Sequence, residues 1–483
     1  GYKGHNGKKQ NRNKQKIMSM HNYDVLIIGS GPGGYVAAIR ASQLGMSVGV
    51  VEKAEPGGIC LNWGCIPTKA LLKSAQVLEY CRHAADYGII AGEIPSPDFG
   101  AVIARSRGVA DAMSKGIQYL FKKNNIQIIT GFGRIRGGGT VEVIATDGTL
   151  QSYSAKHVII ATGARSRELP ALRQDGRKII GYREAMTLPS LPSSMVVVGS
   201  GAIGSEFASF YRSMGTELTL VEFMPRILPL EDEEVSRTVE RAFKKMKMKI
   251  MTGSSVESVD TSVSPCRVTV KTPKGEETIT AEIVMSAVGI TPNIEGIGLE
   301  ESGVATDRGK ITVDEFYRTS VGGIYAIGDV VPGPALAHVA SAEAIVCVEK
   351  IAGLDPEPVD YFNIPACTYT TPEVASCGLT EEAARAAGME TKTGKFMFMA
   401  SGKASAAGAR EGFVKLVFNA ADDRLVGGHM TGMNVTEMIS SIVIARKLGA
   451  TAHDIVRSIH PHPTMSEGVM EAAAAALGEA IHG

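Results

Sequence analysis

Residues 25–34 read VLIIGSGPGG, an apolar run that ends in a glycine-rich turn. A short, continuous apolar run is typical of a strand buried on both faces. In the turn, Gly29, Gly31 and Gly34 form a G-x-G-x-x-G pattern. The first glycine allows the turn, the second lets a pyrophosphate approach the backbone, and the third lets a helix pack close to the strand. This stretch therefore predicts the first strand and helix of a nucleotide-binding domain.

The residues after the turn complete this unit. A second strand is expected over Ser47 to Val51, and Glu52 follows it directly. A carboxylate at that point can accept hydrogen bonds from a ribose. The glycine pattern alone would be weak evidence, because the chain contains 55 glycines. With strand, helix and terminal acid all in place, the pattern favours a dinucleotide site.

A second copy of the unit lies further along the chain. Gly199, Gly201, Gly204 and Glu222 each stand 170 positions after the matching residue of the first unit. Two complete fingerprints on one chain imply two nucleotide sites. Such a pair suits an electron relay between a bound flavin and a diffusible nicotinamide. Spacing alone does not decide which site holds which nucleotide.

The segment GGICLNWGCIPTKALL, which begins at Gly57, contains two cysteines five positions apart. That spacing turns Cys60 and Cys65 to different faces of a regular helix. A disulfide between them needs an irregular turn, which Gly64 permits. The positive end of a following helix, and Lys69 four residues after Cys65, would both favour a thiolate. The cysteines are therefore either a redox-active dithiol or a pair of buried, inert thiols.

The same segment resembles the active-site segment of the flavin-dependent pyridine nucleotide-disulfide oxidoreductases. The Leu-Asn between the cysteines and the Lys-Ala-Leu-Leu after them are most similar to the branch of the family that oxidises dihydrolipoamide. The resemblance implies that Cys60 exchanges with the substrate and that Cys65 lies against the flavin as the charge-transfer thiolate. It also implies that the first unit binds FAD and the second binds the nicotinamide nucleotide.

Further motifs carry the same resemblance. The sequence HVIIATG, which ends at Gly163, resembles the segment where the family's chain leaves its first domain, and it assigns Thr162 and Gly163 to the FAD site. The sequence TSVGGIYAIGDV resembles the second FAD motif, in which Asp329 can hydrogen-bond a ribityl hydroxyl. The alternative for Asp329 is a helix N-cap. Gly289 ends a strand-then-glycine pattern in the second unit and is assigned to the nicotinamide site.

Two residues of the second unit refine the prediction. Glu206 resembles the family's carboxylate partner of the Lys69 ammonium and is grouped with the nicotinamide site; otherwise it is an ordinary helix-face acid. Glu222 would repel a 2′-phosphate, which favours NAD over NADP. Arg226, the nearest arginine after it, is four residues further on. Many family members have arginine where this chain has Ile290, and what makes that contact here is open.

The C-terminal part lacks a nucleotide fingerprint but contains SIHPHPTMSE and an expected helix over 467–481. His462 and Glu467 match the family's His-Pro-Thr-x-Ser-Glu dyad. A histidine is the natural proton carrier for dithiol chemistry near neutral pH, and an acid beside it fixes its tautomer. His460 and His462 could suggest a metal, but no cysteine or acid stands at ligand spacing, so none is expected. In the family this dyad reaches the dithiol of the other subunit, which implies an obligate homodimer.

We expect an α/β protein with two Rossmann-like domains and a C-terminal α+β dimerisation domain. The FAD-binding domain is expected to be discontinuous, over residues 21–165 and 297–362. The NAD-binding domain is expected over 166–296, and the dimerisation domain over 363–483. Residues 1–20 hold six basic residues and no acid, and we expect a disordered leader or tag.

Composition excludes several classes of protein. The 483 residues are too many for one core, and no apolar run reaches the ~18 residues that cross a bilayer. Seven cysteines, mostly scattered, argue against a secreted disulfide framework and for a reducing, cytoplasmic compartment. Without residues 1–20, 44 basic residues stand against 50 acidic ones, and this net charge of about −6 gives no reason to expect a nucleic-acid partner. A nucleic-acid module that uses the basic leader, or a non-enzymatic flavoprotein, is the alternative from another class.

The resemblance implies that a dihydrolipoyl thiol, deprotonated by His462, attacks the Cys60–Cys65 disulfide, and that electrons then pass through FAD to NAD⁺. The close alternative is an NAD(P)H-dependent reductase of another disulfide or of a metal ion. Glutathione-type enzymes generally prefer NADP, against which Glu222 argues. Mercuric reductases carry an extra cysteine pair near the C-terminus, and this chain has no cysteine after Cys377. Because the chain has no lipoyl-bearing segment, the expected partners are the lipoyl domain and core subunit of a 2-oxo acid dehydrogenase complex.

Overall fold

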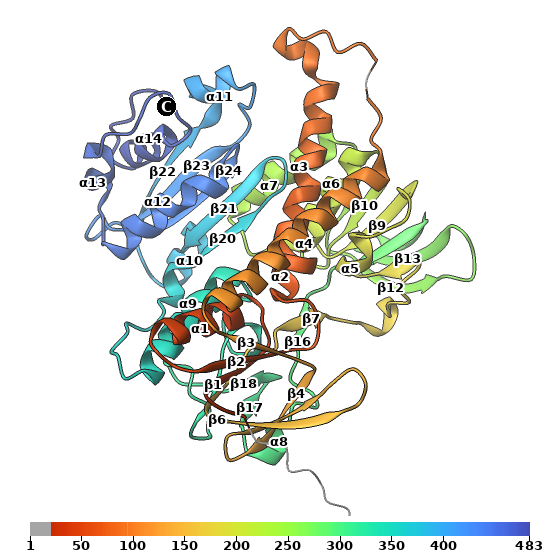
Figure 1. Cartoon of the computed structure of the whole chain (residues 1–483). Coiled ribbons are helices and arrows are strands. Elements are labelled where there is room, and N and C mark those ends of the chain that lie inside the picture. Colours follow the sequence, from red (N-terminus) through yellow and green to blue (C-terminus); the bar gives the residue numbers. More distant parts are fainter. Residues whose placement is uncertain (1–20, 94) are drawn as a thin grey trace, which may run out of the picture.

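A computed structural model describes residues 21–93 and 95–483, which form a first mixed sheet and a second parallel sheet, both flanked by helices, and a C-terminal antiparallel sheet (Figure 1). The prediction made for residues 1–20 lies outside the described residues. None of the helices in the described part of the chain is long and apolar enough to cross a membrane.

The first sheet has the strand order β3-β2-β1-β6-β5-β4, with β19 beside β6. Its strands are β1 (His21–Ile28), β2 (Val48–Glu52), β3 (Gln127–Thr130), β4 (Phe132–Gly137), β5 (Thr140–Ile144), β6 (Leu150–Ile160) and β19 (Ile324–Ala326). One face packs against α1 (Pro32–Gln43), α9 (Ala337–Ile351) and α4 (Phe99–Lys123). The side chains of the other face pack against those of β4 and β5, the end strands of this same sheet. Both faces of β1 are therefore covered, which explains its continuous apolar run.

The second sheet has the order β11-β10-β9-β15-β8 and repeats this plan. Its strands are β8 (Ile179–Ile180), β9 (Ser194–Val198), β10 (Glu217–Val221), β11 (Lys249–Met251) and β15 (Ile283–Ser286). Helices α6 (Ala202–Met214) and α7 (Glu233–Lys245) cover one face. A small antiparallel sheet covers the other, formed by β12 (Ser255–Asp260), β13 (Cys266–Thr272) and β14 (Gly275–Ala281).

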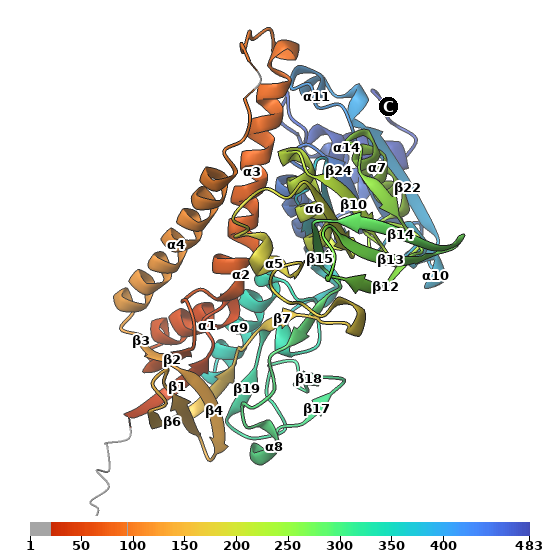
Figure 2. The ribbon, with the colours of Figure 1, turned by 90° about the vertical axis from the view of Figure 1, so that its right-hand side faces the viewer.

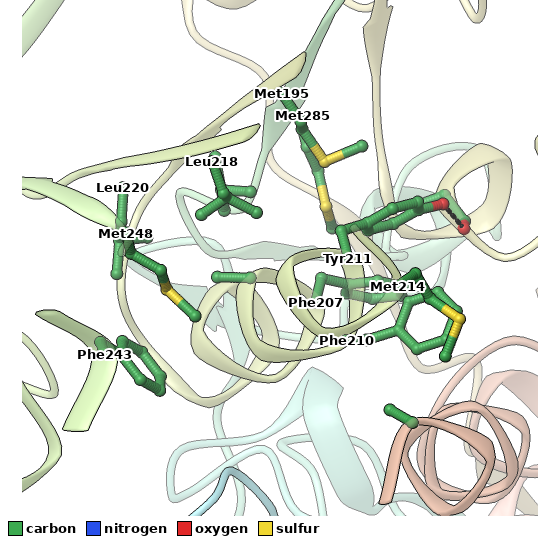
Figure 3. Packing of buried hydrophobic residues seen from close by; sticks show 14 of the residues in the cluster. Met195, Phe207, Phe210, Tyr211, Met214, Leu218, Leu220, Phe243, Met248 and Met285 are labelled. Atoms are coloured by element: carbon green, nitrogen blue, oxygen red, sulfur yellow. Dashed lines mark hydrogen bonds between the residues drawn. The ribbon is translucent and has the colours of Figure 1, made fainter. Parts of the chain in front are cut away.

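Aromatic and methionine side chains fill the core beneath the second sheet (Figure 3). Phe207, Phe210 and Tyr211 of α6 are buried there, and the Tyr211 hydroxyl donates a hydrogen bond to the Ala185 carbonyl (Figure 3). Leu71, from helix α3 (Cys65–Arg82), belongs to the same core. The core therefore fixes α3, which carries one of the two cysteines, against α6 of the second unit.

The chain crosses between the two units twice, and the crossings lie side by side. Strand β7 (Ala164–Ser166) pairs antiparallel with β16 (Ile290–Pro292). After the second unit the chain passes through α8 (Leu299–Ser302), β17 (Thr306–Asp307) and β18 (Lys310–Ile311) and enters the first sheet at β19. The exact domain boundaries stay predictions.

The C-terminal sheet has the antiparallel order β20-β21-β24-β23-β22. Its strands are β20 (Pro365–Thr368), β21 (Glu373–Gly378), β22 (Thr391–Met397), β23 (Phe413–Asn419) and β24 (Leu425–Gly432). The helices around it are α10 (Glu381–Ala386), α11 (Gly402–Ala406), α12 (Val435–Lys447), α13 (Ala452–Arg457) and α14 (Glu467–Ala476). The helix expected over 467–481 was predicted too long. It ends at Ala476, and Gly478 follows with a left-handed φ of 73°, a conformation that commonly ends helices.

Candidate active site

The two cysteines of the dithiol segment lie on separate helices. Cys60 belongs to the six-residue helix α2 (Gly58–Trp63), and Cys65 is the first residue of α3. Gly64 between them has φ −145° and ψ −118°, so the helix breaks there. A Cβ at Gly64 would lie only 3.0 Å from the Ile59 carbonyl oxygen. This break supplies the irregular turn that the spacing requires, and it brings the Cys60 thiol within hydrogen-bonding distance of Cys65.

The two cysteine thiols have pKa values shifted in opposite directions. The pKa of Cys65 is lowered to about 7, because the hydrogen bond from Cys60 and, to a smaller extent, the Lys69 ammonium outweigh the opposing effect of burial. The pKa of Cys60 is raised, because its proton is held in the bond to Cys65 and because the thiol is buried. Near neutral pH, Cys65 is therefore the thiolate and Cys60 keeps its proton.

The ion pair expected between Lys69 and Glu206 is present. The Lys69 Nζ lies 2.9 and 3.1 Å from the two Glu206 carboxylate oxygens. Glu206 is 4% exposed on α6, and its Oε1 also accepts a hydrogen bond from the Tyr369 backbone at 2.9 Å. The Nζ also lies 4.3 Å from the centre of the Tyr369 ring. Glu206 is therefore no ordinary helix-face acid: it links the dithiol helix to the second unit. Its grouping with the nicotinamide site stays a prediction.

The acid of the first nucleotide fingerprint is fixed in place. Glu52 Oε2 accepts hydrogen bonds from the Ser30 backbone at 2.9 Å and from the Ser30 hydroxyl at 2.5 Å, and Oε1 accepts one from the Ala54 backbone at 2.9 Å. An ionised carboxylate has about four acceptor positions. The three protein contacts orient this carboxylate and leave one position on Oε1 for a ribose hydroxyl.

The second fingerprint repeats this arrangement. Glu222 Oε2 accepts from the Ser200 backbone at 2.8 Å and from its hydroxyl at 2.6 Å, and Oε1 accepts from the Met224 backbone at 2.8 Å. Arg226 lies 3.7 Å from Glu382 and 3.4 Å from two backbone carbonyl oxygens. Because Arg226 is engaged elsewhere, the negative charge of Glu222 is not offset, and the site favours a nucleotide without a 2′-phosphate.

The glycines of both fingerprints form cradles that fit a pyrophosphate. A Cβ at Gly34 would lie 1.9 Å from the Gly29 carbonyl oxygen, so only glycine lets α1 approach its strand so closely. A Cβ at Gly31, the N-cap of α1, would meet the Gly58 Cα at 3.9 Å, whereas one at Gly201, the N-cap of α6, would meet nothing within 4 Å. Neither helix start has a side-chain capping bond. Uncapped N–H groups at a helix start are suited to bind phosphate oxygens. The residues present therefore fit a dinucleotide in each unit, and the assignment of FAD to the first and NAD to the second stays a prediction.

The other predicted nucleotide contacts lie at the same edge of the sheets. Thr162 donates its hydroxyl to the Asn293 carbonyl at 2.6 Å, and the Gly163 carbonyl accepts from the Asn293 backbone at 2.8 Å. Both residues thus hold the two crossings together. Burial raises the pKa of Asp329, which lies in a short 3₁₀ turn directly after β19. Gly289 adopts φ 114° beyond β15.

The predicted dyad is formed. His462 Nδ1 lies 2.7 Å from Glu467 Oε1, and Glu467 Oε2 accepts from the Thr464 backbone at 2.8 Å. Burial would raise the pKa of Glu467, but the bonds from Thr464 and His462 lower it overall. Because Glu467 occupies Nδ1, the imidazole keeps Nε2 to exchange a proton. The His462 side chain is 76% exposed.

One chain does not bring its own dyad to its own dithiol. His462 lies just before α14, which is set apart from α2 in both views (Figures 1 and 2). In Figure 1 the C-terminal sheet stands between α13 and α14 on one side and α2 on the other. The described residues contain no group of three or more histidine, cysteine or acidic side chains that could hold a metal ion.

Sequence reasoning did not find Glu343, which is 1% exposed on α9. Its carboxylate accepts from the Gly328 backbone and from the Tyr361 hydroxyl, both at 2.6 Å, and Tyr361 in turn lies 2.9 Å from Tyr317. Burial raises the pKa of Glu343 to about 7. This network fixes the turn that carries Asp329. The signal available was an acid within the apolar middle of α9, whose other acid, Glu349, lies near the end of the helix.

Comparison with known proteins gives consistent matches. Residues 23–344 match the family described as pyridine nucleotide-disulphide oxidoreductase, and residues 364–473 match its dimerisation domain. The chain is 47% identical over 479 residues to the dihydrolipoyl dehydrogenase of Rhizobium etli, covering 95% of this chain and 99% of that protein. It is 45% identical over 470 residues to that of Bacillus subtilis, with the same coverage. The crystal structure of LpdA from Mycobacterium tuberculosis has a TM-score of 0.87 at 27% identity, covering 94% of this chain and 99% of that chain.

Proposed function

This chain belongs to the pyridine nucleotide-disulphide oxidoreductase family, and from that membership we propose that it works as a dihydrolipoyl dehydrogenase. It oxidises dihydrolipoamide to lipoamide and reduces NAD⁺ to NADH. The observation that carries this proposal is the Cys60–Cys65 pair, in which one sulfur is a thiolate near pH 7 and the other keeps its proton.

The first unit is the FAD site in this proposal. Its glycine turn and the start of α1 hold the pyrophosphate, Glu52 binds a ribose, and Asp329 binds the ribityl chain, with Thr162 and Gly163 at the same edge. FAD, when bound, supplies two-electron chemistry between the dithiol and NAD⁺. The corresponding NAD contacts in the second unit are Gly199, Gly201, Gly204, Glu206, Glu222 and Gly289.

The dithiol exchange proceeds through residues of the chain itself. His462 Nε2 takes the proton of one dihydrolipoyl thiol, and the resulting thiolate attacks the Cys60 sulfur of the oxidised pair. The Cys60–Cys65 bond breaks, and Cys65 leaves as the thiolate. The second lipoyl sulfur then attacks the sulfur already joined to Cys60, closes the lipoamide disulfide and releases Cys60. Two electrons thus pass from the substrate to the cysteine pair.

Lys69 and Glu206 stabilise the thiolate product. The positive Lys69 favours the charged form of Cys65, and the bidentate contact with Glu206 fixes the ammonium beside it. A low pKa makes Cys65 the better leaving sulfur, because exchange is faster when the departing thiol is more acidic.

The protein is a homodimer through its dimerisation domain, and we propose that the dyad of one subunit serves the dithiol of the other. The separation of α14 from α2 within one chain supports this arrangement, as does the exposure of His462 (Figure 2). The lipoyl group arrives on the lipoyl domain and core subunit of a 2-oxo acid dehydrogenase complex. The unpaired, scattered cysteines favour a cytoplasmic location.

The test is turnover with matched substrates. The purified protein should oxidise dihydrolipoamide with NAD⁺ much faster than with NADP⁺, and Cys60→Ser should abolish this turnover. A preparation that retains no flavin, or that instead reduces glutathione disulfide with NADPH, would contradict the proposal.

A further inference from the structure

The helix that carries Cys60 cannot hold its own position. Helix α2 has six residues, and isolated helices this short are unstable. Glycines with φ 105° and 64° precede Cys60, and the break at Gly64 follows it. The position of the Cys60 sulfur therefore depends on side-chain contacts made by the rest of α2.

Trp63, the last residue of α2, is contacted by two cationic side chains. The Arg107 guanidinium carbon is 4.2 Å from the centre of a Trp63 ring, and that of Arg183 is 5.2 Å away. Both distances lie within the range of a cation–π interaction. Arg107 is half-buried, and this burial lowers the pKa of its guanidinium. Among the described residues, neither Trp63 Nε1 nor Arg107 Nη1 has a hydrogen-bond partner, so the indole is not held by a hydrogen bond of its own.

The two arginines come from different parts of the fold. Arg107 lies on α4, and its Nη2 donates a hydrogen bond to the Asn62 carbonyl of α2. Its neighbours on α4 bond the start of α3, since Arg105 donates to the Ala70 carbonyl and Ser106 to the Pro67 carbonyl, each at 2.9 Å. Three consecutive residues of α4 therefore donate hydrogen bonds to the backbone on both sides of the Gly64 break.

Arg183 lies on α5 (Tyr182–Ala185), which follows β8 of the second sheet. It reaches Trp63 from the second nucleotide-binding unit, and Figure 2 shows α5 beside α2 and α3. Trp63 thus joins the dithiol segment to the second unit at a place separate from the Lys69–Glu206 pair.

We propose that Trp63, held between Arg107 and Arg183, is a positioning residue for the dithiol, which fixes α2 and the Cys60 sulfur at bonding distance from Cys65. This inference rests on the proposed role of the two cysteines as the redox pair. Without the stack, the two sulfurs meet less often, so their disulfide is less stable relative to the open dithiol. The hydrogen bond from Cys60 that favours the Cys65 thiolate is weakened for the same reason.

The test measures the cysteine pair directly in the flavin-loaded homodimer. Reduced protein is equilibrated with mixtures of reduced and oxidised glutathione, and free thiols are counted by mass spectrometry after an acid quench. In this exchange the pair gives two electrons to glutathione disulfide and forms the internal bond. Trp63→Leu and Arg107→Gln should lower the equilibrium constant for the internal disulfide roughly tenfold, and the exposed Arg183→Gln about twofold. Lys115→Gln, on the exposed face of the same helix α4, should leave it unchanged.

A second readout separates positioning from simple loss of stability. The midpoint pH for alkylation of Cys65 should move above about 7 in Trp63→Leu and Arg107→Gln. Lys69 of α3, Glu206 of α6 and Tyr35 of α1, the other ionisable groups that act on the pair, are unchanged in these variants. Trp63 is the only tryptophan in the sequence, so a red shift of emission in Arg107→Gln reports the opened stack.

If both variants keep the wild-type equilibrium constant and midpoint pH, the inference is wrong. Trp63→Phe, which keeps a ring between the arginines, should recover most of the lost disulfide stability; if it behaves like Trp63→Leu, cation–π stacking is not the cause. Failure of the wild type to be reduced by dihydrolipoamide would instead contradict the proposed function. The glutathione equilibrium needs no lipoyl substrate, so the two failures are distinguishable.

Discussion

Replacement of Lys69 by methionine should raise the pKa of Cys65 while leaving the fold intact. Methionine keeps most of the aliphatic stem of lysine and removes its charge. An opposite charge within about 4–6 Å shifts a pKa by roughly 1–3 units. The Lys69 side chain is one third exposed and its charge is shared with Glu206, so we expect the low end, about one unit. The Glu206 carboxylate, which itself raises the pKa of Cys65, then acts unopposed and adds to the shift.

The size of this effect on reactivity follows from the starting value. With the pKa of Cys65 at about 7, half of the molecules carry the thiolate at pH 7. A rise of one unit, which corresponds to about 1.4 kcal/mol, leaves roughly one molecule in ten as thiolate. Alkylation of Cys65 at pH 7 should therefore slow about fivefold in Lys69→Met. The rates should converge above about pH 9, where both proteins are ionised.

The assay is the pH dependence of iodoacetamide labelling of the reduced homodimer, with the modified cysteine located by mass spectrometry. The matched control is Lys73→Met, one turn further along α3, where the exposed Lys73 bonds Gln76. The control should keep the wild-type midpoint. If Lys69→Met also keeps it, or if Lys73→Met shifts as far, the specific stabilisation of the thiolate by Lys69 is refuted.

Three further predictions follow from the same structure. His462→Gln homodimers should be nearly inactive, because loss of a general base costs roughly 10²–10⁴ in rate, and Cys60→Ser homodimers should be inactive because serine cannot form the disulfide. A mixed and re-associated sample should recover about a quarter of wild-type turnover if each site is shared between subunits, since half of the dimers then hold one intact site; no recovery would place each site within one chain. Glu343 has a raised pKa of about 7, so the folded state binds its proton more tightly than the unfolded state does, and its contribution to stability is lost as pH rises towards 7. Glu343→Gln should therefore show a smaller fall in melting temperature between pH 5 and 8 than the wild type, and equal falls would count against the assigned burial effect. Glu222→Ala should raise the ratio of kcat/KM for NADP⁺ over NAD⁺ by about tenfold or more through loss of repulsion, and an unchanged ratio would mean that other residues select the nucleotide.

Local sequence patterns predicted the two nucleotide-binding units and the kink between the cysteines. The two glycine turns were found because each is a contiguous fingerprint, in which backbone conformation and close packing allow only glycine. The terminal acids were found for the same reason, since Glu52 is the last residue of its strand and Glu222 directly follows its own. The kink between the cysteines could be inferred from the five-residue spacing and Gly64. The end of α14 was misjudged because helical periodicity continues past Gly478, whose left-handed backbone does not.

Local sequence patterns could not predict contacts between segments that are far apart along the chain. Nothing in the sequence around Trp63 indicates that Arg107 and Arg183 stack on it, because those arginines lie on two other helices. Glu343 and Tyr361 likewise meet only once α9 has packed beside β19. Similarity to a family supplied the Lys69–Glu206 partnership, and no spacing rule joins residues 137 positions apart.

The sequence by itself determined which segments bind nucleotide and which sulfurs can join, because turn geometry and helix periodicity act over a few neighbouring residues. Family resemblance had already implied that Cys65 carries the charge, but only the tertiary structure decided which groups stabilise that charge and what holds Cys60 in place. Those outcomes depend on burial and on charges brought together from α2, α3, α4, α5 and α6. Electrostatic and stacking energies depend on distance in space rather than along the chain.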